Sequence, residues 1–518
     1  MENESRGPLL VEIPSADCKP EQVARWNQGR ETPTFRLLRD PMNLEELNEL
    51  ESCVAIWRDN ETLTYVAPKN LFGRSLFEAK EDSLFIPFYD IELKLEIVGK
   101  ADYAIAETAA YFVGLTDSTK TSASQVALYY NSLKNNELDF IAAGSHCFSQ
   151  VLRLPSSELS LFNLTLSPSQ SETLAEESHP VQVSFLNCVL EDGGTSLINA
   201  LEHRQSKFGS LGIDERTTLT DENLDRLLQL DVIDHLSLPL LDPEERALRA
   251  FAVQVESLKY AIWLPTLLKA DFQSFQVVAK KLDLNIEYGG ETIPTEATLS
   301  FLQRLATLGH FEELRLAFYL DGDTVAPECL YEAIMHVALA NSNLKVLDLT
   351  DSYLDWGLRM EMVFESLQDH KGLSQIKVSV EDEEHTFGPD FVFLRQFLSR
   401  NRNVIVTDAS GCVFTDEESI DELYALNRFY QGSSALLMDP PLERLSLVAT
   451  TLLEAALSDF QRSALLFSNH VDLLCQIVQA AGLDDADGPI FDTQPPQSDV
   501  SKRTRETQFL ERSAKQKI

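Results

Sequence analysis

The sequence predicts an α/β fold: a solenoid of parallel strands backed by helices, with an N-terminal α+β region and a C-terminal helical cap. Three observations lead to this prediction. Ten short stretches alternate between apolar and polar residues, which is typical of strands with one buried face. The segments between them have the apolar spacing of helices. At 518 residues, the chain is also too long for one ordinary core.

The first 158 residues divide into two parts. Residues 1–35 are rich in proline, glutamate and arginine and show little periodicity, so we expect them to be disordered. Residues 36–158 contain patterns of both kinds. We expect strands within 53–68 and 84–99, and helices over 101–115 and 122–136. This α+β region is expected to cover the first unit of the solenoid, because the terminal core of such an array must be shielded from water.

Strand-sized units recur through residues 159–408, at spacings of 19 to 33 residues. Each unit contains one pair of apolar positions separated by a polar or variable position, and we expect both members of the pair to face the core. The pairs are Leu164/Leu166, Val183/Phe185, Leu211/Ile213, Leu236/Leu238, Leu258/Tyr260, Leu284/Ile286, Leu314/Leu316, Leu347/Leu349, Ile376/Val378 and Val404/Val406.

The segments between the pairs have helical periodicity. After Leu314/Leu316, Pro327 suits a first helical turn, and Leu330, Ile334 and Val337 share one face. Asn341 is placed to end this helix in a left-handed conformation. Each unit is therefore expected to be a strand, a turn and a helix, stacked on its neighbours to bury its apolar face.

One unit has the spacing L-x-x-L-x-L-x-x-x-x-L, from Leu344 through Leu347 and Leu349 to Leu354. With its strand and helix, it resembles the leucine-rich-repeat proteins, of the longer strand-plus-helix kind typified by ribonuclease inhibitor. The resemblance covers residues 159–408 and implies parallel strands on a concave face and helices on a convex face. Ser352 departs from the family pattern, because asparagine or cysteine is usual at that position.

The C-terminal part contains three amphipathic patterns within residues 409–482, and we expect them to form a helical cap. Ser458 or Asp459 would begin the last helix, and Gly482 would end it. Residues 483–518 are expected to be a disordered tail. Its last 18 residues are basic, with six Lys and Arg against two Glu, which is compatible with a nuclear address or with a solvated terminus.

The charge of the chain disfavours whole classes of partner. Lys and Arg total 43 against 82 Asp and Glu, a formal net charge of −39. Such a surface repels nucleic acid and anionic membranes, so we expect neither as a partner. We expect protein partners with a basic surface. No secretory signal or membrane-length apolar run is recognisable, and the seven cysteines are scattered, so the expected location is intracellular, cytoplasmic or nuclear.

The candidate binding residues are polar positions that alternate with the apolar pairs and so face away from the core. The complete set is Asn163, Thr165, Gln182, Ser184, Ser210, Asp214, His235, Ser237, Ser257, Lys259, Asp283, Asn285, Glu287, Glu313, Arg315, Asp348, Thr350, Gln375, Lys377, Asn403 and Thr407. Those most suited to contact a partner are His235, Lys259, Asp283, Asn285, Glu287, Arg315, Asp348 and Lys377. The set contains no aromatic side chain, and it would equally serve only to keep the sheet wet.

The leading hypothesis is a non-enzymatic scaffold that binds proteins on the concave or loop face. One alternative is a ubiquitin-ligase substrate receptor, although residues 40–150 lack a convincing three-helix F-box pattern. A second is an enzyme with a site around Trp57, Asp59, His146 and Cys147. We expect no catalytic residue, no metal site and no cofactor. The acidic run 380–385 lacks the spacing of a calcium loop, and Gly193-Gly194 suits a simple turn better than an anion site.

Overall fold

The computed structural model describes residues 8–14, 34–69, 82–116, 123–132, 136–290, 292–320, 326–350, 352–380, 382–436, 448, 450–451, 460–471 and 473. The chain divides into two compact units, Met1–Tyr424 and Ala425–Ile518. The predicted tail, 483–518, lies outside the described residues.

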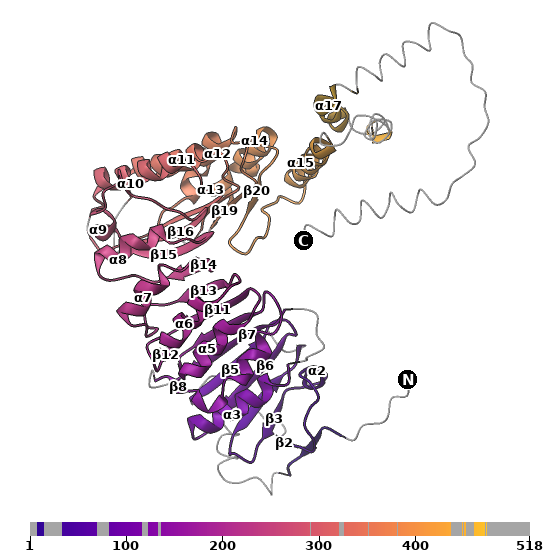
Figure 1. Cartoon of the computed structure of the whole chain (residues 1–518). Helices are drawn as coiled ribbons and strands as arrows, with labels where there is room; N and C mark the ends of the chain where they lie inside the picture. Colours follow the sequence, from indigo (N-terminus) through magenta and orange to yellow (C-terminus); the bar gives the residue numbers. More distant parts are fainter. Residues whose placement is uncertain are drawn as a thin grey trace, which may run out of the picture. The chain divides into compact units, whose positions relative to one another are not determined.

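One long sheet organises the first unit (Figure 1) and contains 17 strands within the described residues. In spatial order they are β1 (Leu10–Glu12), β2 (Thr34–Leu37), β3 (Val54–Trp57), β4 (Leu63–Ala67), β6 (Leu93–Val98), β5 (Ser83–Phe88), β7 (Gln125–Asn131), β9 (Glu158–Phe162), β11 (Val181–Leu186), β13 (Gly209–Ile213), β14 (Ile233–Leu238), β15 (Ser257–Trp263), β16 (Lys281–Tyr288), β17 (Glu313–Leu320), β18 (Val346–Leu349), β19 (Gln375–Val378) and β20 (Ile405–Thr407). From β7 to β20 every neighbouring pair is parallel. The chain is therefore a mixed α/β protein with a long sheet, as predicted.

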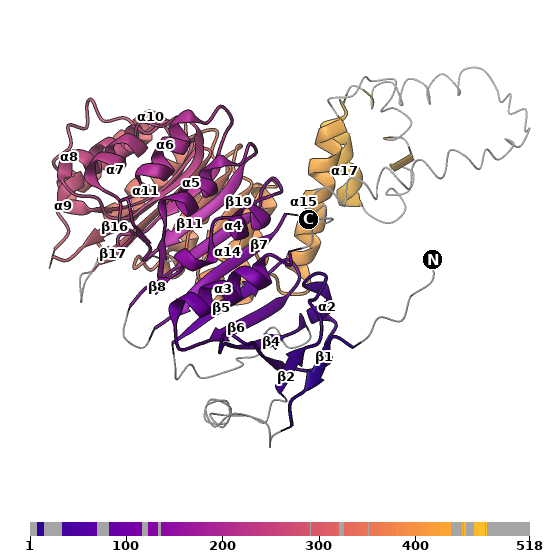
Figure 2. The same cartoon turned by 60° about the horizontal axis from the view of Figure 1, so that its bottom comes forward.

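Helices connect the parallel strands and lie along one side of the sheet (Figure 2). They are α5 (Pro168–Glu176), α6 (Thr195–His203), α7 (Asp221–Leu227), α8 (Glu244–Arg249), α9 (Leu264–Leu267), α10 (Thr295–Leu308), α11 (Glu328–Ala340), α12 (Met360–Leu367), α13 (Glu383–Phe387) and α14 (Val392–Arg400). Parallel strands require such crossovers, since a two-residue turn cannot return the chain to the same edge. We call the side of the sheet that faces away from these helices the open face.

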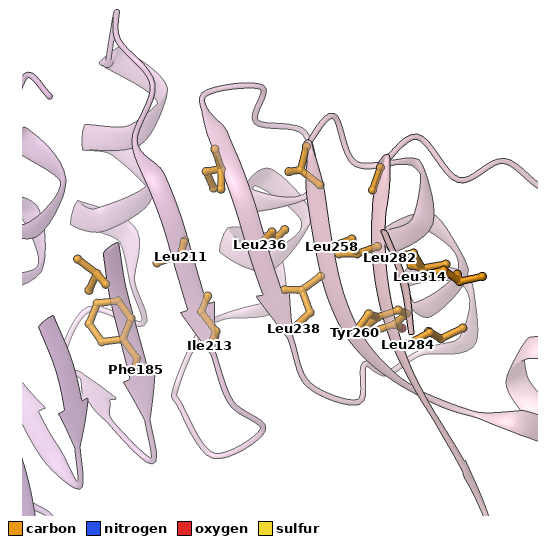
Figure 3. Close-up of a cluster of buried hydrophobic side chains, with 14 of the residues drawn as sticks. Phe185, Leu211, Ile213, Leu236, Leu238, Leu258, Tyr260, Leu282, Leu284 and Leu314 are labelled. Carbon is orange, nitrogen blue, oxygen red and sulfur yellow. The ribbon is translucent and has the colours of Figure 1, made fainter. Parts of the chain in front are cut away.

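The core lies between the sheet and the helices, and alternate residues of each strand point into it. Strand β16 shows the pattern well, because Leu282, Leu284 and Ile286 are at most 2% exposed while the residues between them are only partly buried. Figure 3 shows such side chains from successive strands side by side, among them Leu211, Leu236 and Leu258. The predicted period-two alternation is confirmed in these strands.

One of the ten predicted pairs needs correction. Leu164 and Leu166 are buried, but they belong to a separate sheet of β8 (Leu138–Asp139), β10 (Leu164–Leu166) and β12 (Val189–Leu190). Residues 159 and 161 of β9 take their place, since Leu159 and Leu161 pair in register with β11. The pairs Leu284/Ile286 and Val404/Val406 are buried as predicted. The structure adds their register: Leu282 and Leu284 lie opposite Leu258 and Tyr260, and Val406 lies opposite Ile376.

The N-terminal region contributes strands to the same sheet, together with α2 (Glu45–Asn48), α3 (Asp102–Val113) and α4 (His146–Val151). The prediction of a helix over 122–136 is wrong, because β7 pairs in parallel with β9 through residues 125–129. Disorder over 1–35 is also wrong in part. Leu10–Glu12 form β1, which pairs with β2, whereas residues 1–7 and 15–33 lie outside the described residues.

The C-terminal helices lie at the unit boundary and beyond it. Helix α15 (Ser419–Ala435) begins in the first unit, where Ile420 and Tyr424 are buried in the main core. The Tyr424 hydroxyl accepts a hydrogen bond from the Val406 N–H at 3.2 Å. In the second unit, α17 (Phe460–Asn469) donates from the Asn469 amide to the Ser433 and Ser434 hydroxyls of α15. Most of the second predicted helix, and the predicted end residues Ser458, Asp459 and Gly482, lie outside the described residues.

Asparagine side chains, rather than a left-handed backbone, close two of the helix ends. Asn341 ends α11 with φ of −94°, so the left-handed conformation predicted there is wrong. Its buried amide donates to the Val337 carbonyl and accepts from the Phe311 N–H. Asn401 ends α14 in a similar way, donating to the carbonyls of Leu367 and His370. These bonds satisfy backbone groups that a helix end leaves unpaired.

None of the helices that the structure describes is long and apolar enough to cross a membrane.

Candidate interaction surface

One row of residues crosses the open face with alternating charge. The register places Lys259 of β15, Asp283 of β16, Arg315 of β17, Asp348 of β18 and Lys377 of β19 opposite one another. We call these five residues the charge row. Neighbouring strands are about 4.8 Å apart, so each charge lies beside one of opposite sign. Sequence alternation predicted that each of the five faces outward; the order of their charges follows from the register.

Arg315 is at the centre of the charge row. Its side chain is less exposed than those of Asp283, Asp348 and Lys377, the other members in ion pairs. Its side chain is 12% exposed, and Nη1 donates to Asp283 Oδ1 at 2.6 Å and to Asn285 Oδ1 at 2.7 Å. Nη2 lies 3.4 Å from the Tyr319 hydroxyl. Burial by itself would lower the pKa of Arg315, but the hydrogen bond and charge of Asp283, with Tyr319, raise that pKa above its ordinary value. Arg315 is thus a fixed cation.

The remaining charge-row members are held more loosely. Lys377 Nζ lies 4.0 Å from Asp348 Oδ2. Asp348 is positioned by Thr350, whose N–H and hydroxyl both donate to Oδ1, at 2.9 Å and 2.6 Å. Lys259 is exposed at the opposite end of the row. The charges of the row can therefore reach solvent or a partner at both ends, while the centre is internally paired.

His235 belongs to a different row of the open face. The register aligns it with Ser210, Ser257 and, through Ser257, with Lys281 and Glu313. Lys281 Nζ lies 2.9 Å from Glu313, and this hydrogen bond raises the pKa of Lys281. The eight predicted binding residues therefore lie on one face but in separate rows.

An aromatic group at the carboxyl ends of the strands was not predicted. Trp263 of β15, Glu287 of β16 and Tyr319 of β17 lie opposite one another. The Tyr319 ring meets the Tyr353 ring edge-on, with 5.7 Å between centroids. Trp263 is 44% exposed and Tyr353 is 68% exposed. We call Trp263, Tyr319 and Tyr353 the aromatic cluster. Its presence corrects the expectation that the open face has no aromatic side chain.

Several residues predicted to face a partner instead stabilise turns. Asn163 and Asn187 follow β9 and β11 with φ of 58° and 52°, a region that asparagine tolerates better than most residues. Asn187 donates to Asn163 Oδ1, and Asn163 donates to the Tyr130 carbonyl, both at 2.7 Å. Asp214 accepts from the Asn187 N–H at 2.9 Å. Asn163 and Asp214 are therefore links in a ladder between turns, and Thr165 lies in the small sheet.

Two other members of the predicted set, Thr350 and Thr407, are buried at 3% exposure. Ser352, which departs from the leucine-rich-repeat pattern, accepts the Phe318 N–H at 3.1 Å and the Leu354 N–H at 3.3 Å. A serine hydroxyl thus links neighbouring units here in the way that Asn187 does nearer the N-terminus.

Three of the residues considered for catalysis, Cys147, His146 and Trp57, differ in burial and in their contacts. Cys147 is 4% exposed and donates to the Gly144 carbonyl at 3.3 Å. Its burial raises the pKa of the thiol to about 12, which keeps it protonated at neutral pH. His146 is exposed on the same helix and contacts Gln150 at 3.2 Å. Trp57 is buried in a separate small core with Ala55 and Tyr65.

The glycine turn and the acidic run also have structural explanations. Asp192 accepts the N–H groups of Gly194 and Ser196 at the start of α6, so its carboxylate already occupies the position that an anion would take. Asp382 caps α13 by accepting from Glu384 and His385. No group of three or more His, Cys, Asp or Glu side chains in the described part of the chain is arranged to hold a metal.

No protein-family model matches this sequence, and neither does any curated protein. The function of the open face must therefore be inferred from its own geometry and chemistry.

Proposed function

We propose that the chain is a non-enzymatic scaffold that binds a protein partner on the open face of strands β14 to β19. The observation that carries the proposal is the combination of Trp263, Tyr319 and Arg315 on one helix-free stretch of sheet, with Tyr353 of the loop after β18 packed against Tyr319. Tryptophan, tyrosine and arginine are the residues in which interface binding energy is concentrated. Exposed apolar side chains that lie together mark interaction sites, whereas single ones are common on any surface. Trp263 is 44% exposed and Tyr353 is 68% exposed at the same end of the strands.

The proposal includes a leucine-rich-repeat-like solenoid with the open face as its concave side. The parallel register from β9 to β19, the repeated strand-helix order and the asparagine and serine links between turns support it. In such an array each unit contacts only its neighbours, so a wide surface is built from short local contacts. Side chains held on strands are also better fixed than side chains on loops, which lowers the entropy cost of binding.

The proposed partner is a protein with a basic surface, met inside the cell, in the cytoplasm or the nucleus. The net charge of −39 supports this choice, because it favours encounter with cations and opposes encounter with nucleic acid or anionic lipid.

The two alternatives lack supporting geometry. The part of residues 40–150 that the structure describes mixes strands and helices, and its strands β3 to β7 belong to the long sheet, which does not favour a three-helix F-box. The protonated, buried thiol of Cys147 does not favour the proposed nucleophile. Neither alternative therefore has a described site that could replace the open face as the functional surface.

Photo-crosslinking from both sides of the sheet tests the proposal. A photoreactive phenylalanine analogue is placed at Ser237 or Lys259 on the open face, and at Ser300 or Leu339 on the exposed side of α10 and α11. In cells, we expect the same protein to be captured from both open-face positions and from neither helix position. Capture of the same proteins from all four positions, or from the helix positions alone, would refute the assignment of the binding face.

A further inference from the structure

The two edges of the parallel sheet differ in charge. At the carboxyl edge, the segments that follow β14, β18, β19 and β20 contain Asp242, Glu244, Glu245, Asp355, Asp382, Glu383, Glu384 and Asp408. At the amino edge, the segments that precede strands contain both signs, with Lys207, Lys280, Lys345, Lys371 and Arg402 against Asp231, Glu256, Glu312 and Asp369. The carboxyl edge is therefore more acidic than the amino edge.

Helix dipoles explain part of this polarity. The helices return antiparallel to the strands, so their N-termini lie at the carboxyl edge, where carboxylates such as Glu244 and Glu383 are favoured. Asp355 and Asp408 lie in loops of the same edge, so their charge adds to that of the carboxylates at the helix N-termini. At the amino edge, lysines are neutralised by nearby carboxylates: Lys345 Nζ lies 2.6 Å from Glu312. The carboxyl edge thus presents exposed negative charge to an approaching partner, within the roughly 8 Å over which charges act in physiological salt.

The aromatic cluster lies at this acidic edge. Trp263 and Tyr319 are two strands apart, a backbone separation of about 10 Å, and Glu287 of the strand between them has the same register. A cationic side chain above β16 would be within reach of both rings. Aromatic faces attract cations, and a neighbouring carboxylate adds a charge-assisted interaction. Tyr353 extends the aromatic surface on the β18 side.

We propose that the aromatic cluster and Glu287 receive an arginine or lysine side chain of a partner polypeptide. The proposal rests on the proposed function, and it specifies which chemistry the open face recognises and where. A partner chain bound there would also lie over the charge row. Arg315, which Asp283 and Asn285 hold in place, would then put a positive charge next to that chain. The partner is therefore expected to place its cation at the carboxyl edge and neutral or acidic residues above Arg315.

A fluorescein-labelled peptide of alternating arginine and serine is the probe, and the same peptide with citrulline for arginine is its uncharged control. Fluorescence anisotropy with the full chain should show binding of the arginine peptide that weakens with salt, and at least about tenfold weaker binding of the citrulline peptide. Trp263→Ala should weaken arginine-peptide binding at least about tenfold. Leu339→Ala, which changes an equally exposed apolar residue on α11, should leave it unchanged.

Each other outcome overturns the assignment in a different way. Equal binding of the two peptides would exclude recognition of the cation. Equal binding by Trp263→Ala would place the cation elsewhere on the acidic surface. Binding only after removal of residues 483–518 would make the chain's own basic segment the occupant. If neither peptide binds while the open-face crosslinks described above persist, the scaffold function stands and the cationic partner is wrong; if both fail, the scaffold function fails as well.

Discussion

The ion pair between Arg315 and Asp283 should couple two neighbouring strands. Arg315→Met removes the 2.6 Å bond to Asp283 and the 2.7 Å bond to Asn285, while the methionine retains most of the apolar contact of the side chain. Asp283→Asn removes the same pair from the other side. Exposed ion pairs contribute roughly 0.2–1 kcal/mol, and loss of one partner of a buried pair costs roughly 3–5 kcal/mol.

The magnitude expected here lies between these limits. The side chains are 12% and 31% exposed, so Asp283 keeps water while Arg315 has little. We expect Arg315→Met to cost about 2 kcal/mol, and the two changes to show a coupling energy of about 1–2 kcal/mol in a double-mutant cycle. The control cycle is Lys377→Met with Asp348→Asn, where the separation is 4.0 Å. Its coupling should stay below about 0.5 kcal/mol.

Native-state hydrogen exchange is the suitable assay, because a long array of units need not unfold in one step. The opening free energy of amides in β16 and β17 is compared for the wild type, both single variants and the double variant. A coupling energy indistinguishable from the control cycle would refute the reasoning, since the two charges would then be held independently by solvent.

Three further predictions concern other parts of the first unit. In the native protein near pH 8, iodoacetamide should modify the exposed Cys412 but not Cys147, whose pKa is about 12, and mass spectrometry should detect Cys147 alkylation only after denaturation. Asn187→Ala should destabilise the protein by about 2 kcal/mol, from the lost hydrogen bond and the φ of 52°, whereas Asn187→Gly should cost about 1 kcal/mol less in urea unfolding. The hydrogen bond from Arg246 lowers the pKa of Asp225 below its ordinary value of 3.8. This contribution is present above that value and is lost as the pH falls through the lowered pKa, so the stability difference between wild type and Arg246→Met should shrink on acidification. A difference that grows below pH 4 would contradict the sign.

The facing of the strand residues could be predicted from the sequence, but the register could not. Alternation reports which side of a strand meets water, and it holds in β16 over Leu282, Leu284 and Ile286. All three are apolar, so the sequence alone offers two equally good pairs. The hydrogen bonds between β15 and β16 decide which pair lies opposite Leu258 and Tyr260. The same register places Asp283 beside Lys259.

Strand length and tertiary pairing explain the elements that were missed. Trp263 and Tyr319 each lie four residues beyond a predicted charge, with the same facing, but the predicted strands stopped short of them. In β7, apolar residues spaced for a helix pair instead with β9. Alternation predicted an outward side chain for Asn163, but its positive φ places it in a turn after β9. The only hint of that turn in the sequence is the asparagine itself, because asparagine is common in turns.

Hydroxyl-radical footprinting of the full chain, alone and with the protein captured from the open face, tests the central claim most directly. If a partner occupies the open face, oxidation of Trp263 and Tyr353 falls on binding. Oxidation of Tyr103, 61% exposed on α3, and of Leu339 stays the same. Unchanged oxidation of Trp263 and Tyr353 in the complex, or protection confined to Leu339, would show that the partner binds elsewhere and would contradict the account.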